Sequence, residues 1–351
     1  MPWRMPAASM DSPGLTVKVR PLGKIEIWKV IGSLSLAVLK LQQPPILPSN
    51  QNPLGALPAR FRRQRVLIVG CGDVGMRVVR QMNPRVQITA ITSTGARTAA
   101  LRVLGVRVLR ADLDQPHSLR RLAGLAHRVI DLAPPAPEGW TDTRTRALVT
   151  ALRRRAPPQA LVYGSTSGVY GNCDGAWVDE TRTLQPDTAR ARRRADAESG
   201  IRFLGRSAGV AVSILRIPGI YAPDREGGTP RKRLLAATPV LRAEDDVYTN
   251  HIHADDLARA CVAALWRARP QRVYNVNDDT CLKMGDYFDL AADLFGLPRP
   301  PRLPRAAAAA ELPLGMLSFM GESRRMDNRR LKRELKLVLR YPTVEQGLRP
   351  P

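Results

Sequence analysis

A short apolar run that breaks into three spaced glycines is the feature that most constrains this chain. Within 66–79 (VLIVGCGDVGMRVV), a strand-like segment is followed by Gly70, Gly72 and Gly75 and then by a helix-like segment. The pyrophosphate of a dinucleotide needs this order: the first glycine makes the tight turn, the second lets the backbone approach the phosphates, and the third lets the helix pack on the strand. The helix N-terminus adds free N–H groups and a partial positive charge. A purely structural turn is the alternative, and the flanking strand and helix favour the nucleotide site.

From residue 64 onward, strand-like and helix-like segments alternate. The helical segments carry regularly spaced apolar residues, such as Leu119, Leu122 and Leu125. This alternation predicts an α/β protein with a Rossmann-type, doubly wound parallel sheet that is covered on both faces. We expect a smaller C-terminal substrate cap to follow it. The expected strands are 66–69, 86–91, 106–110, 129–132, 161–163 and 212–215. Ligands of such sheets bind at the carboxyl ends of the strands.

The first 63 residues differ in character from the rest. They hold many prolines and no glycine motif, and their mostly apolar stretch, 31–41, is too short to span a bilayer. We therefore expect 1–63 to be a disordered leader, or the product of a misplaced start codon, and we expect no membrane partner. We expect 64–210 to be the NAD(P)-binding Rossmann half, and 211–351 to supply the remaining strands and the substrate-binding cap.

Cysteine use and charge restrict the other classes of function. The four cysteines are widely scattered, and neither they nor the histidines have the spacing of a zinc site, so we expect no metal and a reducing, cytoplasmic location. The net charge of +24 comes mostly from arginines that are spread along the chain. We interpret them as solvated helix faces, with acidic ligands or non-specific polyanions as the alternative. Aromatic residues make up only 5% of the chain, which argues against a single-stranded nucleic-acid partner.

The end of the second predicted strand bears on the choice of cofactor. Enzymes that use NAD often place a carboxylate here, which binds the ribose 2′-OH. This chain instead has Thr92, Ser93, Thr94, Gly95 and, two residues later, an arginine. Hydroxyls with an arginine suit a 2′-phosphate better, because a guanidinium offers charge-assisted hydrogen bonds. The sequence therefore favours NADP over NAD. Alternatively, that arginine, Arg97, only begins a solvated helix.

Two further strand ends supply candidate cofactor contacts. After the third predicted strand, Asp112 is expected to bond the adenine amine, or Asp114 to cap the helix that begins near Gln115. After the fourth, Leu132-Ala-Pro-Pro135 places small, stiff residues where a cofactor would pass. The full set of expected cofactor-binding residues is Gly70, Gly72, Asp73, Val74, Gly75, Ser93, Arg97, Asp112, Leu113, Ala133 and Pro218.

The fifth predicted strand leads into the most specific stretch of the chain. Residues 161–171 (LVYGSTSGVYG) resemble the Ser-Ser-x-x-Val-Tyr-Gly segment of the extended short-chain dehydrogenase/reductase family, which includes the nucleotide-sugar epimerases and dehydratases. Further segments resemble motifs of that family in the same order: 214–221 (ILRIPGIY), 251–258 (HIHADDLA), 273–276 (VYNV) and 328–335 (NRRLKREL). The resemblance covers about 64–347 and implies an NAD(P)-binding Rossmann fold.

The resemblance also implies roles for single residues. Thr166 takes the place of the catalytic Ser/Thr, which hydrogen-bonds the substrate. The family then needs a Tyr-x-x-x-Lys, but here Arg190 stands at the tyrosine position and Arg194 at the lysine position. An arginine can replace the charge of the lysine and its ribose bonds, but it stays protonated and cannot replace the phenol as proton donor. Tyr170 and Tyr221 are substitute donors to consider, although the matching tyrosines of the family are mainly structural. The chain thus resembles atypical members of the family, and we expect Thr166, Arg194 and Tyr170 at the catalytic site.

Weaker patterns leave alternatives open. His251 and His253 alternate and would share one face of a strand, where a structural or substrate-contacting role is favoured over metal binding. Met316, Phe319 and Met320 would form an apolar lid over the substrate pocket or a dimer contact.

Two functions follow from these observations. The first is an NAD(P)-dependent oxidoreductase or epimerase/dehydratase-like enzyme that acts on an unidentified small molecule, with a homodimer to be considered. The second is a non-catalytic NAD(P)-binding sensor, which the missing tyrosine supports. We favour the enzyme, because the Ser165-Thr166 pair and a full-sized cap are retained. We expect no specific nucleic-acid partner.

Overall fold

The computed structural model describes residues 63–82, 84 and 86–349, all of which belong to one compact unit. The predicted leader, apart from Arg63, lies outside these residues. Within them, seven parallel strands form a central sheet in the order β12-β7-β5-β4-β1-β2-β3. Their bounds are β1 Arg65–Val69, β2 Gln87–Thr92, β3 Arg107–Arg110, β4 Arg128–Asp131, β5 Ala160–Thr166, β7 Ala211–Ile217 and β12 Arg272–Asn275. The predicted doubly wound α/β fold is confirmed.

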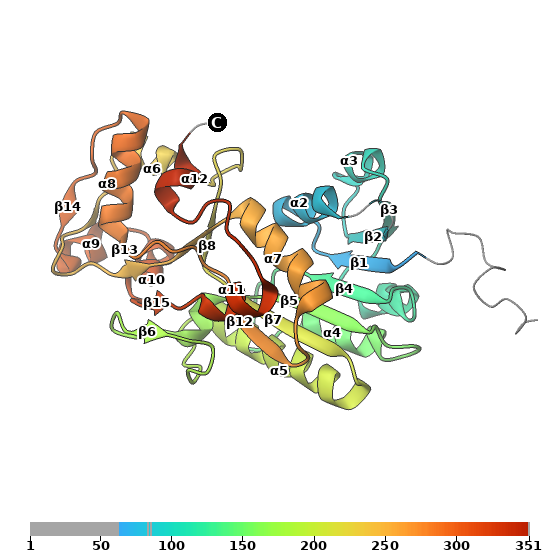
Figure 1. The fold of residues 1–351 in the computed structure, drawn as a ribbon. Coiled ribbons are helices and arrows are strands. Elements are labelled where there is room, and N and C mark those ends of the chain that lie inside the picture. Colours follow the sequence, from blue (N-terminus) through green and yellow to red (C-terminus); the bar gives the residue numbers. More distant parts are fainter. Residues whose placement is uncertain (1–62, 83, 85, 350–351) are drawn as a thin grey trace, which may run out of the picture. The chain divides into compact units, whose positions relative to one another are not determined.

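Helices cover both faces of this sheet (Figure 1). One face packs against α2 (Asp73–Gln81), α3 (Thr98–Val103), α7 (Ala254–Arg267) and α11 (Arg329–Leu335). The other packs against the 3-10 helix η2 (Pro116–Leu122), α4 (Thr143–Leu152) and α5 (Ala189–Ala208). The apolar run of β1 serves both faces, because Val66 and Ile68 point into the first core and Leu67 and Val69 into the second. A strand buried on both sides reads as a continuous apolar run, which is why the sequence revealed it.

The direction in which successive strands are added to the sheet changes at β1. Strands β2 and β3 lie on one side of β1, and β4, β5, β7 and β12 lie on the other. In open α/β sheets this reversal leaves a crevice at the carboxyl ends of the central strands, which is where dinucleotides bind. The loop that follows β1 holds the glycine motif, so the motif lies at this crevice.

Short elements beyond the carboxyl ends of the strands form the cap, which gathers at the left of Figure 1. Strand β10 pairs with β13 in antiparallel fashion, and the pairs β11·β8, β14·β9 and β15·β6 are parallel. The cap and its connections comprise the 3-10 helix η3 (Ser167–Tyr170), β6 (Trp177–Val178), β8 (Gly219–Tyr221), α6 (Arg231–Leu235), β9 (Val240–Leu241), β10 (Tyr248–Thr249), β11 (His251–His253), β13 (Leu282–Lys283), α8 (Met284–Phe295), β14 (Arg302–Leu303), α9 (Arg305–Glu311), α10 (Leu314–Met320), β15 (Arg325–Met326) and α12 (Val344–Leu348).

A buried ion pair joins the strands that carry the site. Arg216 of β7 and Glu198 of α5 are each about 2% exposed or less, and their closest N–O distance is 2.8 Å. The Ser165 hydroxyl of β5 donates to Glu198 (2.7 Å). The guanidinium also lies 4.7 Å from the ring centre of Tyr170, whose hydroxyl donates to Asn275 of β12 (2.7 Å). This cluster therefore fixes the carboxyl ends of three neighbouring strands, β5, β7 and β12.

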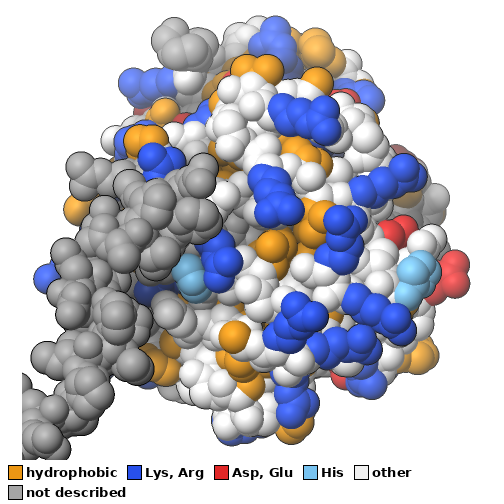
Figure 2. Space-filling view, turned by 90° about the vertical axis from the view of Figure 1, so that its right-hand side faces the viewer, with side chains coloured by type: hydrophobic (Ala, Val, Ile, Leu, Met, Phe, Trp, Pro, Cys, Tyr) orange, Lys and Arg blue, Asp and Glu red, His pale blue; other side chains and the backbone are white. Residues whose placement is uncertain are grey.

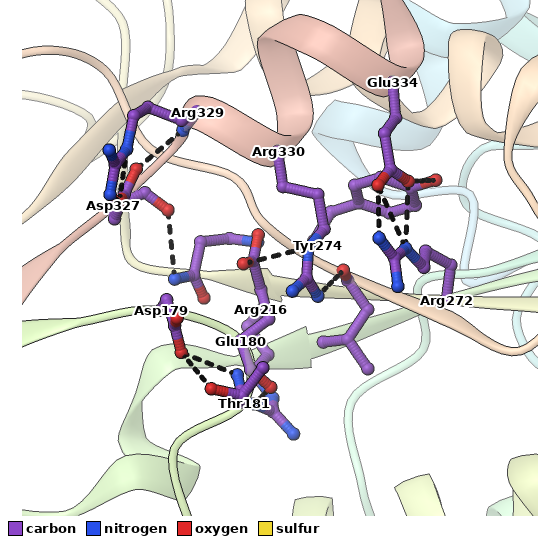
Figure 3. A network of polar contacts seen from close by, with 12 residues as sticks. Asp179, Glu180, Thr181, Arg216, Arg272, Tyr274, Asp327, Arg329, Arg330 and Glu334 are labelled. Carbon is purple, nitrogen blue, oxygen red and sulfur yellow. Dashed lines mark hydrogen bonds and ion pairs between the residues drawn. The ribbon is translucent and has the colours of Figure 1, made fainter.

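A second set of polar contacts extends the cluster toward α11 (Figure 3). The carboxylate of Glu180 accepts from the Asn275 backbone N–H (3.0 Å) and pairs with Arg330 (3.3 Å). Nearby, Arg272 pairs with Glu334, which also accepts from the Tyr274 hydroxyl at 3.2 Å. The loop after β6, strand β12 and helix α11 are thus joined by charges as well as by the core.

We predict that Glu198→Gln destabilises the fold strongly. Glutamine keeps an acceptor for Ser165 but leaves Arg216 buried without a counter-ion, which lowers the free energy of unfolding by about 3–5 kcal/mol. Urea unfolding of both proteins measures the change. The exposed Glu226→Gln is the matched control and is expected to stay within about 0.5 kcal/mol of the parent. A loss below about 1 kcal/mol for Glu198→Gln would show that this pair does not hold the strands.

Candidate functional site

The turn between β1 and α2 is built so that only glycine fits at its start. Gly70 has a φ of +78°, and a Cβ there would overlap the backbone of Ala133, which follows β4. Its carbonyl accepts from the Gly72 N–H (2.8 Å), which closes the turn. A Cβ on Gly75 would lie 3.2 Å from that same carbonyl oxygen, so this glycine allows close packing of helix on turn. The turn is therefore pressed against the end of β4.

The N-terminus of α2 is left open for an anion. Gly72 is its N-cap and supplies no side-chain hydrogen bond to the first turn. The nearest atom to a Cβ built on Gly72 is Nη1 of Arg97, at 3.3 Å. First-turn N–H groups without a side-chain cap, beside a guanidinium, are the features that bind phosphate. These residues fit a dinucleotide pyrophosphate.

Arg97 reaches this turn from the neighbouring strand. It follows β2 and is the N-cap of α3, and its Nη1 donates to the carbonyl oxygen of Cys71 at 3.4 Å. Ser93 and the residues up to Arg97 are exposed. Although Arg97 does precede a helix, its guanidinium crosses over the glycine turn rather than pointing away into solvent. A cation thus lies where the second strand meets the cofactor crevice.

At the end of β3, one predicted alternative is wrong. Asp114 does not cap the following helix: the N-cap of η2 is Gln115, with no side-chain hydrogen bond. Asp114 instead forms a two-point ion pair with Arg144 of α4 (2.7 and 2.5 Å), because a long guanidinium within reach outcompetes a single backbone N–H. Asp112 accepts from the Asp114 N–H (3.0 Å) and stays at the end of the strand, with Leu113 between them.

Arg194 contacts the residues that hold the glycine turn. It is buried on α5, and its Nη1 donates to the carbonyl of Ala133 (3.0 Å) and to the Tyr163 hydroxyl (2.9 Å). Because Ala133 packs against Gly70, this arginine holds the glycine turn in place through the protein backbone. The sequence predicted that Arg194 binds the ribose or a phosphate. In the structure its guanidinium instead bonds the Ala133 carbonyl and the Tyr163 hydroxyl.

A buried carboxyl lies beside the same backbone. Asp131, the last residue of β4, accepts from the Ala133 N–H at 3.1 Å. Burial raises the pKa of Asp131 to about 7, while the N–H bond and the Arg194 charge act in the opposite direction. The carboxyl is therefore much easier to protonate than that of an exposed aspartate.

A cavity of about 730 Å³ adjoins the crevice on the cap side. It brings together Thr166 at the end of β5, Arg190 in the first turn of α5, and Pro218 after β7. The Thr166 hydroxyl accepts from the Gly168 N–H (3.3 Å) and so caps η3. Two of the three residues predicted as a lid or a dimer contact, Met316 and Phe319, line this cavity, as a lid would.

Arginines dominate the charge of this cavity. Arg190, Arg225, Arg233 and Arg324 line it, and burial together with the nearby Arg193 and Arg194 lowers the pKa of Arg190. Arg233 lies over the Phe288 ring (4.3 Å), and its Nε and Nη2 are buried with no hydrogen-bond partner in the described part of the chain. Unpartnered buried guanidinium nitrogens favour an anionic ligand. Sequence reasoning missed this set, because the residues are spread over 135 positions of an arginine-rich chain.

Charged contacts join the cavity to the glycine turn. Arg77 of α2 is buried and pairs with Asp73 (3.3 Å), Asp224 (2.7 Å) and Asp255 (2.6 Å). Arg225, which lines the cavity, also pairs with Asp73 (3.4 Å). Asp73 therefore stands between the site predicted for the cofactor and the cavity, held by cations from both sides. No sequence motif marked these partners.

The two substitute tyrosines are poorly placed as proton donors. Tyr170 is fully buried outside the cavity, its hydroxyl donates to Asn275, and burial raises its pKa to about 12. Tyr221 lines the cavity, but its hydroxyl donates to the carbonyl of Thr343 (3.2 Å), and burial raises its pKa far above its usual range. The structure thus does not bring Tyr170 together with Thr166.

The alternating histidines have separate contacts. His251 lines the cavity and stacks on Tyr287 (4.1 Å between ring centres), and burial lowers its pKa to about 4, so it is neutral. His253 accepts from the Asp255 N–H (3.2 Å) and caps α7. Among the residues that the structure describes, no group of three or more His, Cys, Asp or Glu could hold a metal ion. None of the described helices is long and apolar enough to cross a membrane.

One face of the molecule carries its positive charge in a dispersed form (Figure 2). On the face shown in Figure 2, Lys and Arg side chains are scattered between polar and apolar ones, and acidic side chains are few. On this face the basic side chains are thus open to solvent.

Comparisons with known proteins identify the family. The model of the NAD dependent epimerase/dehydratase family matches residues 66–277. A functionally unknown conserved protein from Silicibacter pomeroyi is similar in structure, with 29% identity, a TM-score of 0.68, and coverage of 81% of this chain and 96% of that chain. UDP-glucose 4-epimerase from Thermotoga maritima (17%, 0.68) and MoeE5 in complex with UDP-glucose and NAD (21%, 0.64) have the same coverage and show the fold alone.

No curated protein matches the chain. The family match extends from the glycine turn to the loop after β12, and so contains the crevice, Thr166 and Arg190. It confirms the resemblance found in the motifs. The chain belongs to the NAD-dependent epimerase/dehydratase family, within the extended short-chain dehydrogenases/reductases.

Proposed function

We propose that this protein is an NADP-dependent oxidoreductase or epimerase/dehydratase-like enzyme that acts on an anionic hydroxyl or carbonyl compound. The observation that carries the proposal is the joint position of Thr166 and Arg190 on one cavity of about 730 Å³ beside the glycine turn. A non-catalytic dinucleotide sensor is the second candidate, and the arginine at the tyrosine position favours it.

NADP is preferred because of the charge beside the turn. The segment after β2 has no carboxylate to bind a ribose 2′-OH, and the guanidinium of Arg97 lies over the turn. We assign the pyrophosphate to Gly70, Gly72, Asp73, Val74 and Gly75, the ribose phosphate to Ser93 and Arg97, the adenine to Asp112 and Leu113, and the path of the cofactor to Ala133 and Pro218.

The chain's own residues suggest a division of roles. When bound, the nicotinamide supplies hydride exchange with the substrate carbon. The Thr166 hydroxyl orients the substrate oxygen by a hydrogen bond. The guanidinium of Arg190 stabilises the negative charge that develops on that oxygen. Because arginine stays protonated, water delivers the proton. Arg194 is a positioning residue, which acts through Ala133.

The arginines of the cavity indicate the class of substrate. Arg233 has two buried, unpartnered nitrogens within the described residues, whereas Arg225 and Arg324 pair with Asp73 and Glu322. A phosphate or carboxylate on the substrate would pair with Arg233. Two similar structures are described as complexes with UDP-glucose, whose diphosphate has the matching charge. We therefore propose a nucleotide sugar or a comparable phosphorylated compound.

Three further assignments stay predictions. The cofactor half is 64–210, and the remaining strands and cap are 211–351. A homodimer is supported by the exposed aromatic rings of Trp140, in the loop before α4, and of Phe203 on α5. A cytoplasmic location is supported by the four cysteines, all of which are free thiols.

Titration calorimetry of the full chain tests the cofactor. We expect saturable binding of NADP⁺ that is tighter than binding of NAD⁺. Arg97→Ala should weaken NADP⁺ binding about tenfold or more, because a charged hydrogen bond contributes about 1.5–3 kcal/mol, and should weaken NAD⁺ binding less. Gly72→Asp should abolish both. The exposed Arg102→Ala on α3 is the matched control. Equal affinities for both nucleotides in the parent and in Arg97→Ala would contradict the NADP assignment.

A second titration tests the anionic substrate. With NADP⁺ present, UDP-glucose is the probe, and Arg233→Gln should weaken its binding about tenfold through the lost charged contact. Arg231→Gln, an exposed neighbour on the same helix, should bind as the parent does. If Arg233→Gln has no effect while binding persists, the anion does not contact this arginine. If UDP-glucose does not bind at all, the nucleotide-sugar assignment fails.

A further inference from the structure

A loop of the cap reaches the glycine turn. Residues 222–228 connect β8 to α6, and Arg225 and Gly228 of this loop line the cavity of about 730 Å³. Arg225 also pairs with Asp73 in the first turn of α2, at an N–O distance of 3.4 Å. The loop therefore lies where the cavity meets the site proposed for the dinucleotide. None of its residues is among the proposed cofactor contacts.

Hydrogen bonds within the loop set its shape. The Ala222 N–H donates to the Gly228 carbonyl (3.1 Å), and the Gly228 N–H donates to the Arg225 carbonyl (2.9 Å). A Cβ on Gly228 would lie only 2.5 Å from the Ala222 carbonyl oxygen, so only glycine allows this closure. The backbone that carries Arg225 is thus held in a closed turn.

Asp224 fastens the loop to α2. It accepts from Nη2 of Arg77 (2.7 Å), while Nη1 of Arg77 donates to Asp255 (2.6 Å). The third partner of Arg77 is Asp73, whose carboxylate is farther away, at 3.3 Å from Nε. One guanidinium is therefore shared by three carboxylates, and it compensates the charge of Asp73 least. Arg225 is the second cation beside Asp73.

The guanidinium of Arg225 has a free side. Its Nη1 donates to the Ile220 carbonyl (2.7 Å), and its Nε faces Asp73. Its Nη2 bonds none of the described residues, and the side chain is 30% exposed. Because a guanidinium has five N–H donors in one plane, these two contacts orient the group and leave donors for an anion.

We propose that Arg225 is a further dinucleotide-binding residue, which the cap contributes and which pairs with the pyrophosphate beside the first turn of α2. The inference rests on the proposed cofactor. A pyrophosphate at this turn is doubly negative and lies next to the Asp73 carboxylate, and like charges repel. Arg225 offsets this repulsion, because it lies beside Asp73 and has a free donor group. The cofactor is then held by the Rossmann half and by the cap.

The role of Arg225 differs from that of Arg97. The pyrophosphate is common to NAD and NADP, whereas the 2′-phosphate occurs in NADP only. Arg225 therefore adds affinity for both dinucleotides, and Arg97 mainly for NADP. Adenosine 2′-monophosphate, which has the 2′-phosphate but no pyrophosphate, separates the two contributions.

Titration calorimetry of the full chain tests the assignment. Arg225→Gln should weaken binding of NADP⁺ and of NAD⁺ by the same factor of about ten, through the lost charged hydrogen bond, and should leave binding of adenosine 2′-monophosphate unchanged. Arg97→Ala, in contrast, should weaken binding of NADP⁺ and of adenosine 2′-monophosphate. The exposed Arg80→Gln on α2 is the matched control and should bind all three probes as the parent does.

The possible outcomes separate this proposal from the proposed function. If Arg225→Gln binds both dinucleotides as the parent does, Arg225 is not a cofactor contact, while the proposed cofactor stands. Binding of adenosine 2′-monophosphate that weakens to the same extent would show that the substitution distorts the turn, and would also overturn the proposal. So would a loss of UDP-glucose binding with NADP⁺ binding unchanged, because Arg225 would then belong to the substrate site. A parent protein that binds neither dinucleotide overturns the proposed function as well.

Discussion

The buried pair of Arg216 and Glu198 is the interaction on which the site depends. A charge inside a protein is tolerated only when it is paired and hydrogen-bonded, and here both conditions are met by residues from different strands and a helix. The requirement acts in both directions: the pair needs the strands in register, and the strands are held in register by the pair. The Ser165 hydroxyl donates to Glu198 of this pair, so the adjacent Thr166 is held in a fixed position where it lines the cavity.

The glycine turn and the arginine-lined cavity are mechanically joined. Asp73 belongs to the first turn of α2, yet it pairs with Arg225 of the cavity wall and with Arg77, which in turn holds Asp224 and Asp255. A dinucleotide phosphate placed near Asp73 would compete for the same cations. Such a ligand would therefore act on contacts that also hold the cavity wall.

Local patterns revealed the sheet and the turn. Continuous apolar runs identified strands buried on both faces, and the glycines required by a positive φ and by close contact, such as Gly70, were visible as a motif. The leucines at 119, 122 and 125 were read as an ordinary helix, whereas the first two lie in a 3-10 helix, whose repeat of three matches their spacing, and Leu125 lies in the turn after it. Apart from Arg190, which stands at the tyrosine position of the motif, the arginines of the cavity had no local signal, since the fold alone brings positions from 190 to 324 together.

Arg194 also limits how this chain relates to its tyrosine-bearing relatives. Its guanidinium spans a backbone carbonyl and the Tyr163 hydroxyl beneath the glycine turn. Both bonds come from one nitrogen, Nη1, so a lysine whose single ammonium group pointed to a cofactor ribose would give up both of them. Replacing Arg190 by tyrosine and Arg194 by lysine would therefore restore the sequence motif of the family but not the arrangement of its side chains. The departure from the motif is built into the scaffold, and its reversal requires coordinated changes around Ala133 and Tyr163.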